Sequence, residues 1–196
     1  MLIDGLWGTG KTHLVVLAAL KLLNEGKVRE IIYIRNPVEA SVNSKIGFLS
    51  GQIDEKMAPY TAPLHDKLSE LLPQQQIQSL LKESRITGIP TGFLQGRSYN
   101  SAAIIVDEAA SMSWEDLLLI TSRAGEFTRL FFIGDTINQV YLSNKSGFRK
   151  FFEVFDDIES KENGVFTYEL KDQEDIVRSG FLRFVMKKTG IIKDSF

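Results

Sequence analysis

An octapeptide near the start of the chain, GLWGTGKT at residues 5–12, has the residue types and spacing that bind nucleotide phosphates. It fits the phosphate-loop pattern G-x-x-x-x-G-K-[ST] at every fixed position. Glycines in such a loop allow a tight turn whose backbone N–H groups converge on phosphate oxygens. We expect Lys11 to reach the β- and γ-phosphates and the Thr12 hydroxyl to bind Mg²⁺. The residues of the predicted cradle are Gly5, Leu6, Trp7, Gly8, Thr9, Gly10, Lys11 and Thr12.

The residues on either side of the octapeptide also favour a phosphate-binding loop between a strand and a helix. The apolar pair Leu2-Ile3 precedes it, and residues 13–23 form a strongly helix-favouring stretch. A helix that starts at the loop directs the positive end of its dipole at the bound phosphates. The alternative is a glycine-rich turn that merely precedes a buried helix, and the order of strand, loop and helix favours the nucleotide site instead.

An acidic pair at the end of an apolar run supplies the second part of a nucleotide site. Residues 103–106 are continuously apolar, which is typical of a parallel strand buried on both faces, and Asp107 and Glu108 follow directly. Ligands of open α/β sheets lie beyond the carboxyl ends of the strands. We therefore expect Asp107 to hold Mg²⁺, directly or through water, and Glu108 to polarise the attacking water. The alternative is a solvated helix N-terminus, where acids suit the dipole.

The second acid also helps to sort the reaction classes. Kinases of small molecules pass the γ-phosphoryl group to a substrate hydroxyl and have less need of a carboxylate that activates water, so Glu108 favours hydrolysis of ATP with Mg²⁺. Two alternatives stay open. One is a phosphotransferase acting on a small molecule, and the other is a nucleotide-gated oligomeric assembly module with slow turnover.

The composition predicts an ordinary globular protein. The chain has 196 residues, of which 43% are hydrophobic and 24% charged, and we expect one domain over residues 1–196. There is no cysteine and there are only two histidines, so a thiolate or histidine zinc centre is not expected. Neither a membrane-length apolar run nor a signal peptide is visible, which predicts no membrane association and a cytoplasmic location. A net charge of −2 means that any nucleic-acid site must be local.

Strand-like and helix-like segments alternate along the chain. Strands are expected at residues 2–3, 31–34, 86–89, 103–106, 130–133 and 165–170. Helices are expected at residues 13–23, 64–72, 77–81, 114–122, 147–155 and 176–188, with residues 38–60 as a loop. This alternation predicts an α/β fold of three layers, a mostly parallel sheet with helices on both faces. The aromatic face of residues 147–155 is expected in the core.

Sequence blocks spread over nearly the whole chain are more specific than the phosphate loop alone. They are IIYIRNPVEA (31–40), KIGFLSGQIDEKMAPYTAPLHDKL (45–68), FLQGRSYNSAAIIVDEAASMS (93–113), FFIGDTINQV (131–140), KSGF (145–148) and DIVRSG (175–180). Together with the octapeptide they resemble the PhoH-like family of phosphate-starvation ATPases, most closely its short, phage-type members. The resemblance implies a RecA-like core similar to that of superfamily 1 helicases, hydrolysis of ATP, and action on RNA or single-stranded DNA.

The resemblance also assigns residues outside the loop and the acidic pair. Asp135 with Gln139 resembles the γ-phosphate sensor of these helicases, although Asn138 stands at the usual sensor position and either residue fits the role. Arg178 matches a late arginine of the family that contacts the γ-phosphate of its own or a neighbouring subunit. Arg35 and Arg97 match two further arginines of the family. Contact with nucleic acid and contact between subunits are both open for these two arginines.

The implied partners are a single-stranded nucleic acid and further copies of the chain. We expect a homo-oligomer, with a hexameric ring as the candidate form, because a lone core lacks the second RecA-like domain that monomeric helicases close over the γ-phosphate. Arg97 or Arg178 of a neighbour would then complete the site. Arg35 and Lys45 are the candidate contacts to nucleic acid. The family uses residues ahead of the phosphate strand to hold adenine, and only four residues precede Gly5 here, so the choice of adenine over guanine stays open.

Overall fold

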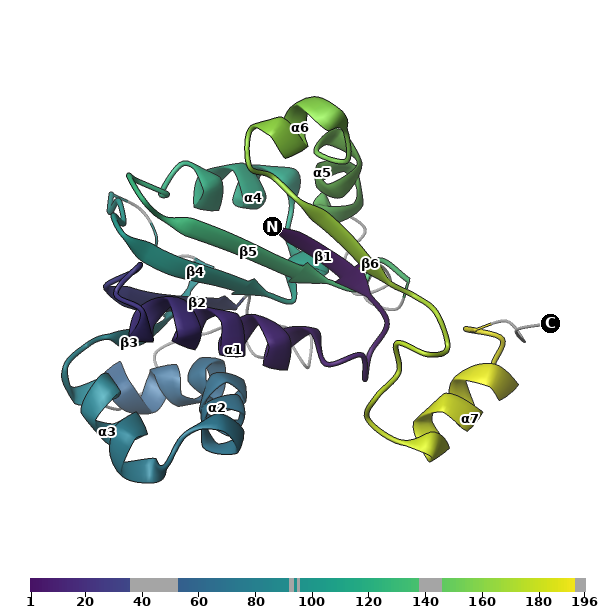
Figure 1. Cartoon of the computed structure of the whole chain (residues 1–196), viewed down its shortest axis with the longest axis horizontal. Helices are drawn as coiled ribbons and strands as arrows, with labels where there is room; N and C mark the ends of the chain where they lie inside the picture. The colour runs from purple at the N-terminus through teal and green to yellow at the C-terminus, as the bar shows by residue number, and fades with distance from the viewer. Residues whose placement is uncertain (36–52, 92–93, 95, 138–145, 193–196) are drawn as a thin grey trace.

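A six-stranded sheet forms the centre of the computed structural model, which describes residues 1–35, 53–91, 94, 96–137 and 146–192 (Figure 1). The strand order is β3-β2-β4-β5-β1-β6 and every pairing is parallel. The strands are β1 (Leu2–Gly5), β2 (Glu30–Arg35), β3 (Ile86–Pro90), β4 (Ala102–Asp107), β5 (Arg129–Gly134) and β6 (Thr167–Leu170). Each of the six strands expected from the sequence is therefore present.

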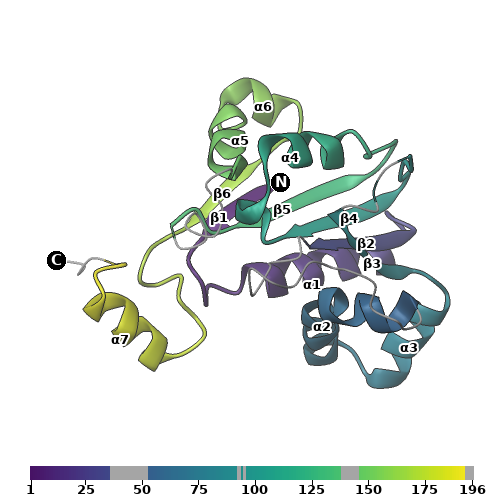
Figure 2. The same ribbon diagram turned by 180° about the vertical axis from the view of Figure 1, so that it is seen from behind.

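Helices cover both faces of this sheet (Figures 1 and 2). The helices are α1 (Lys11–Asn24), α2 (Ile53–Leu71), α3 (Gln74–Lys82), η2 (Ala109–Ser111), α4 (Trp114–Thr121), α5 (Phe148–Val154), α6 (Ile158–Glu162) and α7 (Gly180–Lys188). Helices α1, α2 and α3 lie on one face, whereas α4 and α5 lie on the other. This arrangement confirms the predicted three-layer α/β fold. No helix of the described residues is long and apolar enough to cross a membrane.

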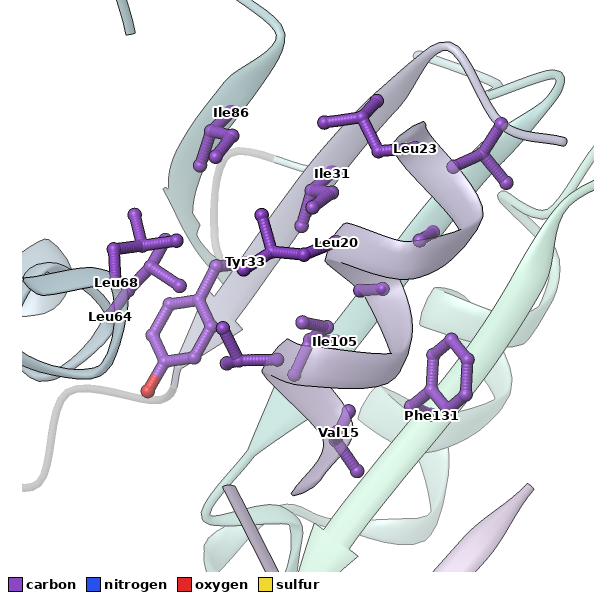
Figure 3. Close-up of a cluster of buried hydrophobic side chains, with 14 of the residues drawn as sticks. Val15, Leu20, Leu23, Ile31, Tyr33, Leu64, Leu68, Ile86, Ile105 and Phe131 are labelled. Carbon is purple, nitrogen blue, oxygen red and sulfur yellow. The ribbon is translucent and has the colours of Figure 1, made fainter. Parts of the chain in front are cut away.

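Two apolar clusters, one on each face, hold the layers together. On the α1 side, Val15 and Val16 pack with Ile31, Ile105 and Phe131 from the sheet (Figure 3). On the other side, the aromatic residues of α5 pack against strands β4 and β5. All six residues of β4 are buried, as expected of a central parallel strand. The aromatic face of α5 thus belongs to the core, as predicted from the sequence.

The register of the sheet brings the predicted functional positions to one edge. Strand β5 lies between β1, which leads into the phosphate loop, and β4, which ends in Asp107. Arg35 at the end of β2 is paired with Asp107, and Asp4 near the end of β1 is paired with Gly134. Because all these strands run in the same direction, their carboxyl ends form a single rim on which a ligand can lie.

Residues 53–60, expected to be a loop, are the start of helix α2. The glycines and proline of residues 38–60 favoured a loop in the sequence, because proline lacks the N–H that a helix interior needs. Residues 55–58, however, read Glu-Lys-Met-Ala and have high helix propensity, and the helix starts ahead of them at Ile53. The rest of that expected loop up to residue 52 lies outside the described residues.

Residues 176–179 were expected to begin the last helix, but α7 starts only at Gly180. The Ser179 side chain caps α7 by accepting a hydrogen bond from the Leu182 N–H. Ile176 is fully buried beside Leu6, and the backbone of the next two residues bonds to the phosphate loop. Tertiary contacts with the loop therefore replace the first helical turn that the sequence pattern favoured.

Gly134 at the end of β5 is expected to tolerate no side chain. A Cβ atom there would lie 2.3 Å from the ring of Phe148, which is itself fully buried at the start of α5. Gly134→Ala should lower the free energy of unfolding by about 1–3 kcal/mol, since a packed core accommodates added volume poorly. Urea unfolding measures the change, and Gly180→Ala is the matched control because nothing lies within 4 Å of its Cβ position. Equal stability of the two variants would contradict this packing.

Candidate functional site

The loop between β1 and α1 has the backbone of an anion cradle. Gly8 has φ +80° and Gly10 has φ +78°, in the left-handed region that favours glycine. Gly10 is also the N-cap of α1, and no side chain caps the helix there. The first N–H groups of a helix have no partner within the helix, so together with the helix dipole they favour an anion at this end of α1.

The segment after β6 is hydrogen-bonded to this loop. The N–H groups of Val177 and Arg178 donate to the carbonyl oxygen of Gly8 at 3.0 and 3.1 Å. Within the loop, the Thr9 hydroxyl donates to the Leu6 carbonyl at 2.8 Å. Leu6 is fully buried in a small apolar cluster with Met186 of α7. The loop is therefore held in its turn by tertiary contacts as well as by its glycines.

Lys11, the first residue of α1, lies over the loop. Its Nζ donates to the carbonyl oxygens of Gly5 and Leu6, both at 2.6 Å. Burial lowers the pKa of Lys11, while nearby carboxylates, Asp135 foremost, act in the opposite direction. A partly desolvated ammonium group held at this place has a strong electrostatic interaction with any anion that enters.

A cavity of about 510 Å³ opens in front of the loop at the carboxyl rim of the sheet. Its volume lies in the range typical of small-molecule sites. It is lined by Trp7, Gly8, Gly10, Lys11, Thr12, His13, Lys67, Glu70, Asp107, Glu108, Ile133, Gly134, Asp135, Val177 and Arg178. The structure thus brings most of the residues predicted from the sequence to one cavity.

A few predicted site residues lie elsewhere. Leu6 and Thr9 belong to the loop but are buried and do not line the cavity, and Gly5 is part of β1. Gln139, the predicted sensor, lies outside the described residues. Arg97 is exposed with its guanidinium 5.1 Å from the centre of the Tyr99 ring, and it does not line the cavity.

The Asp107 carboxylate is the meeting point of three elements. Its Oδ1 accepts a hydrogen bond from the Thr12 hydroxyl of α1 at 3.3 Å, and from the backbone N–H of Glu108 at 3.1 Å. Its Oδ2 accepts a hydrogen bond from the hydroxyl of Tyr33 on β2. Burial, followed by the charge of Asp107, raises the pKa of Tyr33, so its hydroxyl keeps its proton and acts as the donor. A hydroxyl and a carboxylate are the hard oxygen ligands that Mg²⁺ prefers, so this pair fits a magnesium site.

Glu108 has an unusual backbone conformation beside this site. Its φ is +57°, which costs a non-glycine residue about 1–2 kcal/mol. Its Oε1 lies 3.4 Å from the guanidinium of Arg35. Burial, followed by the charge of Asp107, raises the pKa of Glu108, and Arg35 opposes this effect. Strained backbone in a cavity is common at functional sites, and a raised pKa suits a carboxylate that must accept a proton.

Sequence reasoning missed Asp4, which anchors the neighbouring strands. Asp4 is buried in β1 and accepts hydrogen bonds from the N–H and the hydroxyl of Thr136 at 2.9 and 2.6 Å. It also pairs with Lys171 at 2.9 Å, just beyond the end of β6. An aspartate inside a short apolar strand was the available signal, since buried charges are almost always paired.

The rim of the cavity beside α2 also carries residues that the sequence did not single out. His13 of α1 lines the cavity, and its Nδ1 lies 3.0 Å from Glu70. Lys67 donates to the same carboxylate at 2.6 Å. No pattern in the sequence pointed to these residues, because α2 reaches the cavity through its packing against α1 and the sheet.

The parallel sheet, the glycine loop before α1 and the acidic pair at the end of β4 define an α/β domain of the phosphate-loop type. The chain belongs to the PhoH-like family, because the family profile described as "PhoH-like protein" matches residues 1–189. This result confirms the resemblance seen in the sequence. The family is in general one of phosphate-loop ATPases, and the cavity is consistent with that.

Individual relatives agree with this assignment. The chain is 34% identical over 173 residues to a PhoH-like protein of Bacillus subtilis, covering 87% of this chain and 52% of the relative. It is 31% identical over 182 residues to a PhoH-like protein of Synechocystis, covering 92% and 53%. A similarity of 31% over 133 residues links it to protein PhoH2 of Thermobispora bispora, covering 68% and 30%. The chain spans about half the length, or less, of these curated relatives.

Proposed function

We propose that this domain binds ATP with Mg²⁺ in the cavity and hydrolyses it to ADP and phosphate. The observation that carries the proposal is the meeting of Lys11, Thr12, Asp107 and Glu108 at one cavity, although the loop and the acidic pair are about half the chain apart. Membership of a family of phosphate-loop ATPases supports it.

The residues divide the work by their chemistry. Backbone N–H groups of the loop bind the phosphate oxygens, and Lys11 supplies a positive charge to the β- and γ-phosphates. Thr12 and Asp107 would hold Mg²⁺, which supplies charge neutralisation at the phosphates. Glu108 accepts a proton from the water whose oxygen attacks the γ-phosphorus, and ADP leaves with the electron pair of the broken P–O bond.

Arg178 supports the developing charge from its own chain. It lines the same cavity as Lys11, and its N–H is fixed to the Gly8 carbonyl at 3.1 Å. An arginine supplied in cis can stabilise charge on the transferred group. Asp135 directly follows β5 and lines the same cavity, where it would orient the attacking water; Gln139, the other residue of the predicted sensor, lies outside the described residues.

Release of inorganic phosphate from ATP, with and without Mg²⁺, tests the proposal. We expect release that depends on Mg²⁺, and a parallel screen of small-molecule acceptors should show no phosphorylated product. Phosphorylation of an acceptor at a rate above that of phosphate release would instead favour the phosphotransferase.

Single-stranded nucleic acid is the proposed partner of the same rim. Arg35 lies on this rim at the end of β2, and its guanidinium is 3.4 Å from Glu108, the proposed base. A nucleic-acid strand bound at Arg35 would therefore change the electrostatic environment of Glu108. Lys45, the other candidate contact, lies outside the described residues. With a net charge of −2, we expect weak binding with a shallow salt dependence and little sequence preference.

A titration of labelled single-stranded RNA at low salt, with and without a non-hydrolysable ATP analogue, measures this binding, and phosphate release is followed in parallel. Arg35→Ala should weaken any stimulation of phosphate release by RNA. The absence of both binding and stimulation would favour the nucleotide-gated assembly module over action on RNA.

We further propose that the active form is a homo-oligomer, with a hexameric ring as the candidate. Arg97 is the candidate for a residue supplied to a neighbouring subunit, because its exposed side chain lies beside Tyr99 and outside the cavity of its own chain. The molar mass in solution, measured with and without the ATP analogue, tests this; a monomer in both states would overturn it.

A further inference from the structure

Tyr33 is a buried tyrosine in the middle of β2 whose hydroxyl reaches the acidic pair. The residue is 1% exposed, and its ring lies beside Leu64 and Leu68 of α2 (Figure 3). Strand β2 is hydrogen-bonded to β4 along its whole length. The Tyr33 ring is thus fixed between α2 and the sheet, and its hydroxyl is directed at Asp107, the last residue of β4.

The hydrogen bonds of Asp107 divide its two oxygen atoms between different partners. Tyr33 donates to Oδ2, whereas the Thr12 hydroxyl and the Glu108 N–H donate to Oδ1. The last torsion of an aspartate is broad and is not fixed by the side chain itself. A rigid donor to one carboxylate oxygen therefore fixes how the carboxylate plane is turned towards Thr12.

We propose that Tyr33 is a positioning residue for the metal site, holding the Asp107 carboxylate so that Oδ1 and the Thr12 hydroxyl face one cation. This inference rests on the proposed function of the cavity. Hydrogen bonds from an outer partner orient a ligating carboxylate, and their loss typically weakens metal binding by about 10- to 100-fold. Tyr33 thereby becomes part of the site although it does not itself line the cavity.

The variant Tyr33→Phe tests the role, because phenylalanine fills the same space and removes only the hydroxyl. Calorimetry measures binding of the imido analogue of ATP in the absence of Mg²⁺ and at increasing Mg²⁺ concentrations. We expect binding without Mg²⁺ to be unchanged and the Mg²⁺ concentration for half-maximal enhancement to rise about 10-fold. A general loss of structure would weaken binding in both conditions, so the two series separate positioning from folding.

Tyr99→Phe is the matched control. Tyr99 is also buried, at 2% exposure, but it lies in the apolar cluster on the other face of the sheet. Its hydroxyl should have no influence on the Mg²⁺ dependence. An equal shift in both variants would overturn the proposal, as would the absence of any shift in Tyr33→Phe.

A double-variant cycle with Asp107→Asn gives an independent test. If Tyr33 acts through the Asp107 carboxylate, Tyr33→Phe should add no further change in Mg²⁺ dependence once that carboxylate is gone. Additive effects would show that Tyr33 acts by another route. If the unaltered protein binds no nucleotide, the proposed function fails; if it binds nucleotide with Mg²⁺ and Tyr33→Phe behaves identically, only the inference about Tyr33 fails.

Discussion

Replacing Lys11 by alanine is expected to lower the rate of ATP hydrolysis by about 10²-fold or more, with the fold intact. The Nζ of Lys11 lies over the loop, 2.6 Å from two loop carbonyl oxygens, and no other lysine or arginine of the described chain shares those contacts. The variant removes a charge aimed at the β- and γ-phosphates, whereas the backbone N–H groups of the cradle remain. Nucleotide binding should consequently weaken less than turnover does.

Lys21→Ala on the same helix is the control for this experiment. The Lys21 side chain is 75% exposed, three turns along α1 from the loop, and it contacts only Glu25 among the ion pairs of the described residues. Steady-state phosphate release measures the rate, and circular dichroism with thermal unfolding checks the fold. Near-normal turnover in Lys11→Ala would mean that the cavity is not the site of hydrolysis.

Glu108→Gln is expected to lower hydrolysis by about 10²- to 10⁴-fold while ATP stays bound. Glutamine keeps the size of the side chain and an oxygen for the guanidinium of Arg35, which lies 3.4 Å away in the unaltered protein. It removes only the capacity to accept a proton from water. A filter-binding assay should then recover ATP, rather than ADP, with the protein after a long incubation.

The neighbouring acid should behave differently, which makes the comparison informative. Asp107→Asn replaces a charged oxygen beside Thr12, so it should reduce the Mg²⁺ dependence and the retention of nucleotide. Glu115→Gln, at an exposed position in the first turn of α4, is the control and should match the unaltered protein. Equal loss of ATP binding in Asp107→Asn and Glu108→Gln would show that the two acids do not divide the roles in this way.

The fold was largely predictable because its signals are local. A buried parallel strand is a short apolar run, and such runs marked β1, β2, β4 and β5. The more polar segment 165–170 became the edge strand β6, so each expected strand is part of one sheet. The errors lie where a tertiary contact competes with a local preference. Residues 176–179 leave the helical pattern because Ile176 is buried beside the phosphate loop, and α2 begins at Ile53 in spite of a proline at residue 59.

The chemistry of the site was predictable in part for the same reason. The turn of the phosphate loop depends on glycines at positive φ, and Gly8 and Gly10 fix those positions in the sequence itself. Asp107 and Glu108 were recognisable because they end a buried strand, and parallel strands bring their carboxyl ends to one rim. The sequence by itself thus determined the cradle, the acidic pair and their meeting at the same edge.

Only the tertiary structure decided which side chains form hydrogen bonds that hold the strand ends and the acidic pair in place. The hydroxyl of Tyr33 meets Asp107 across 74 positions of the chain, and Asp4 meets Thr136 across 132. Such contacts depend on strand order and register, and a one-residue shift in register would turn Tyr33 to the other face of the sheet. A tyrosine in an apolar strand looks the same in the sequence whether or not its hydroxyl reaches a carboxylate. Its role follows from the pairing of β2 with β4 and from the packing of α2 on the Tyr33 ring.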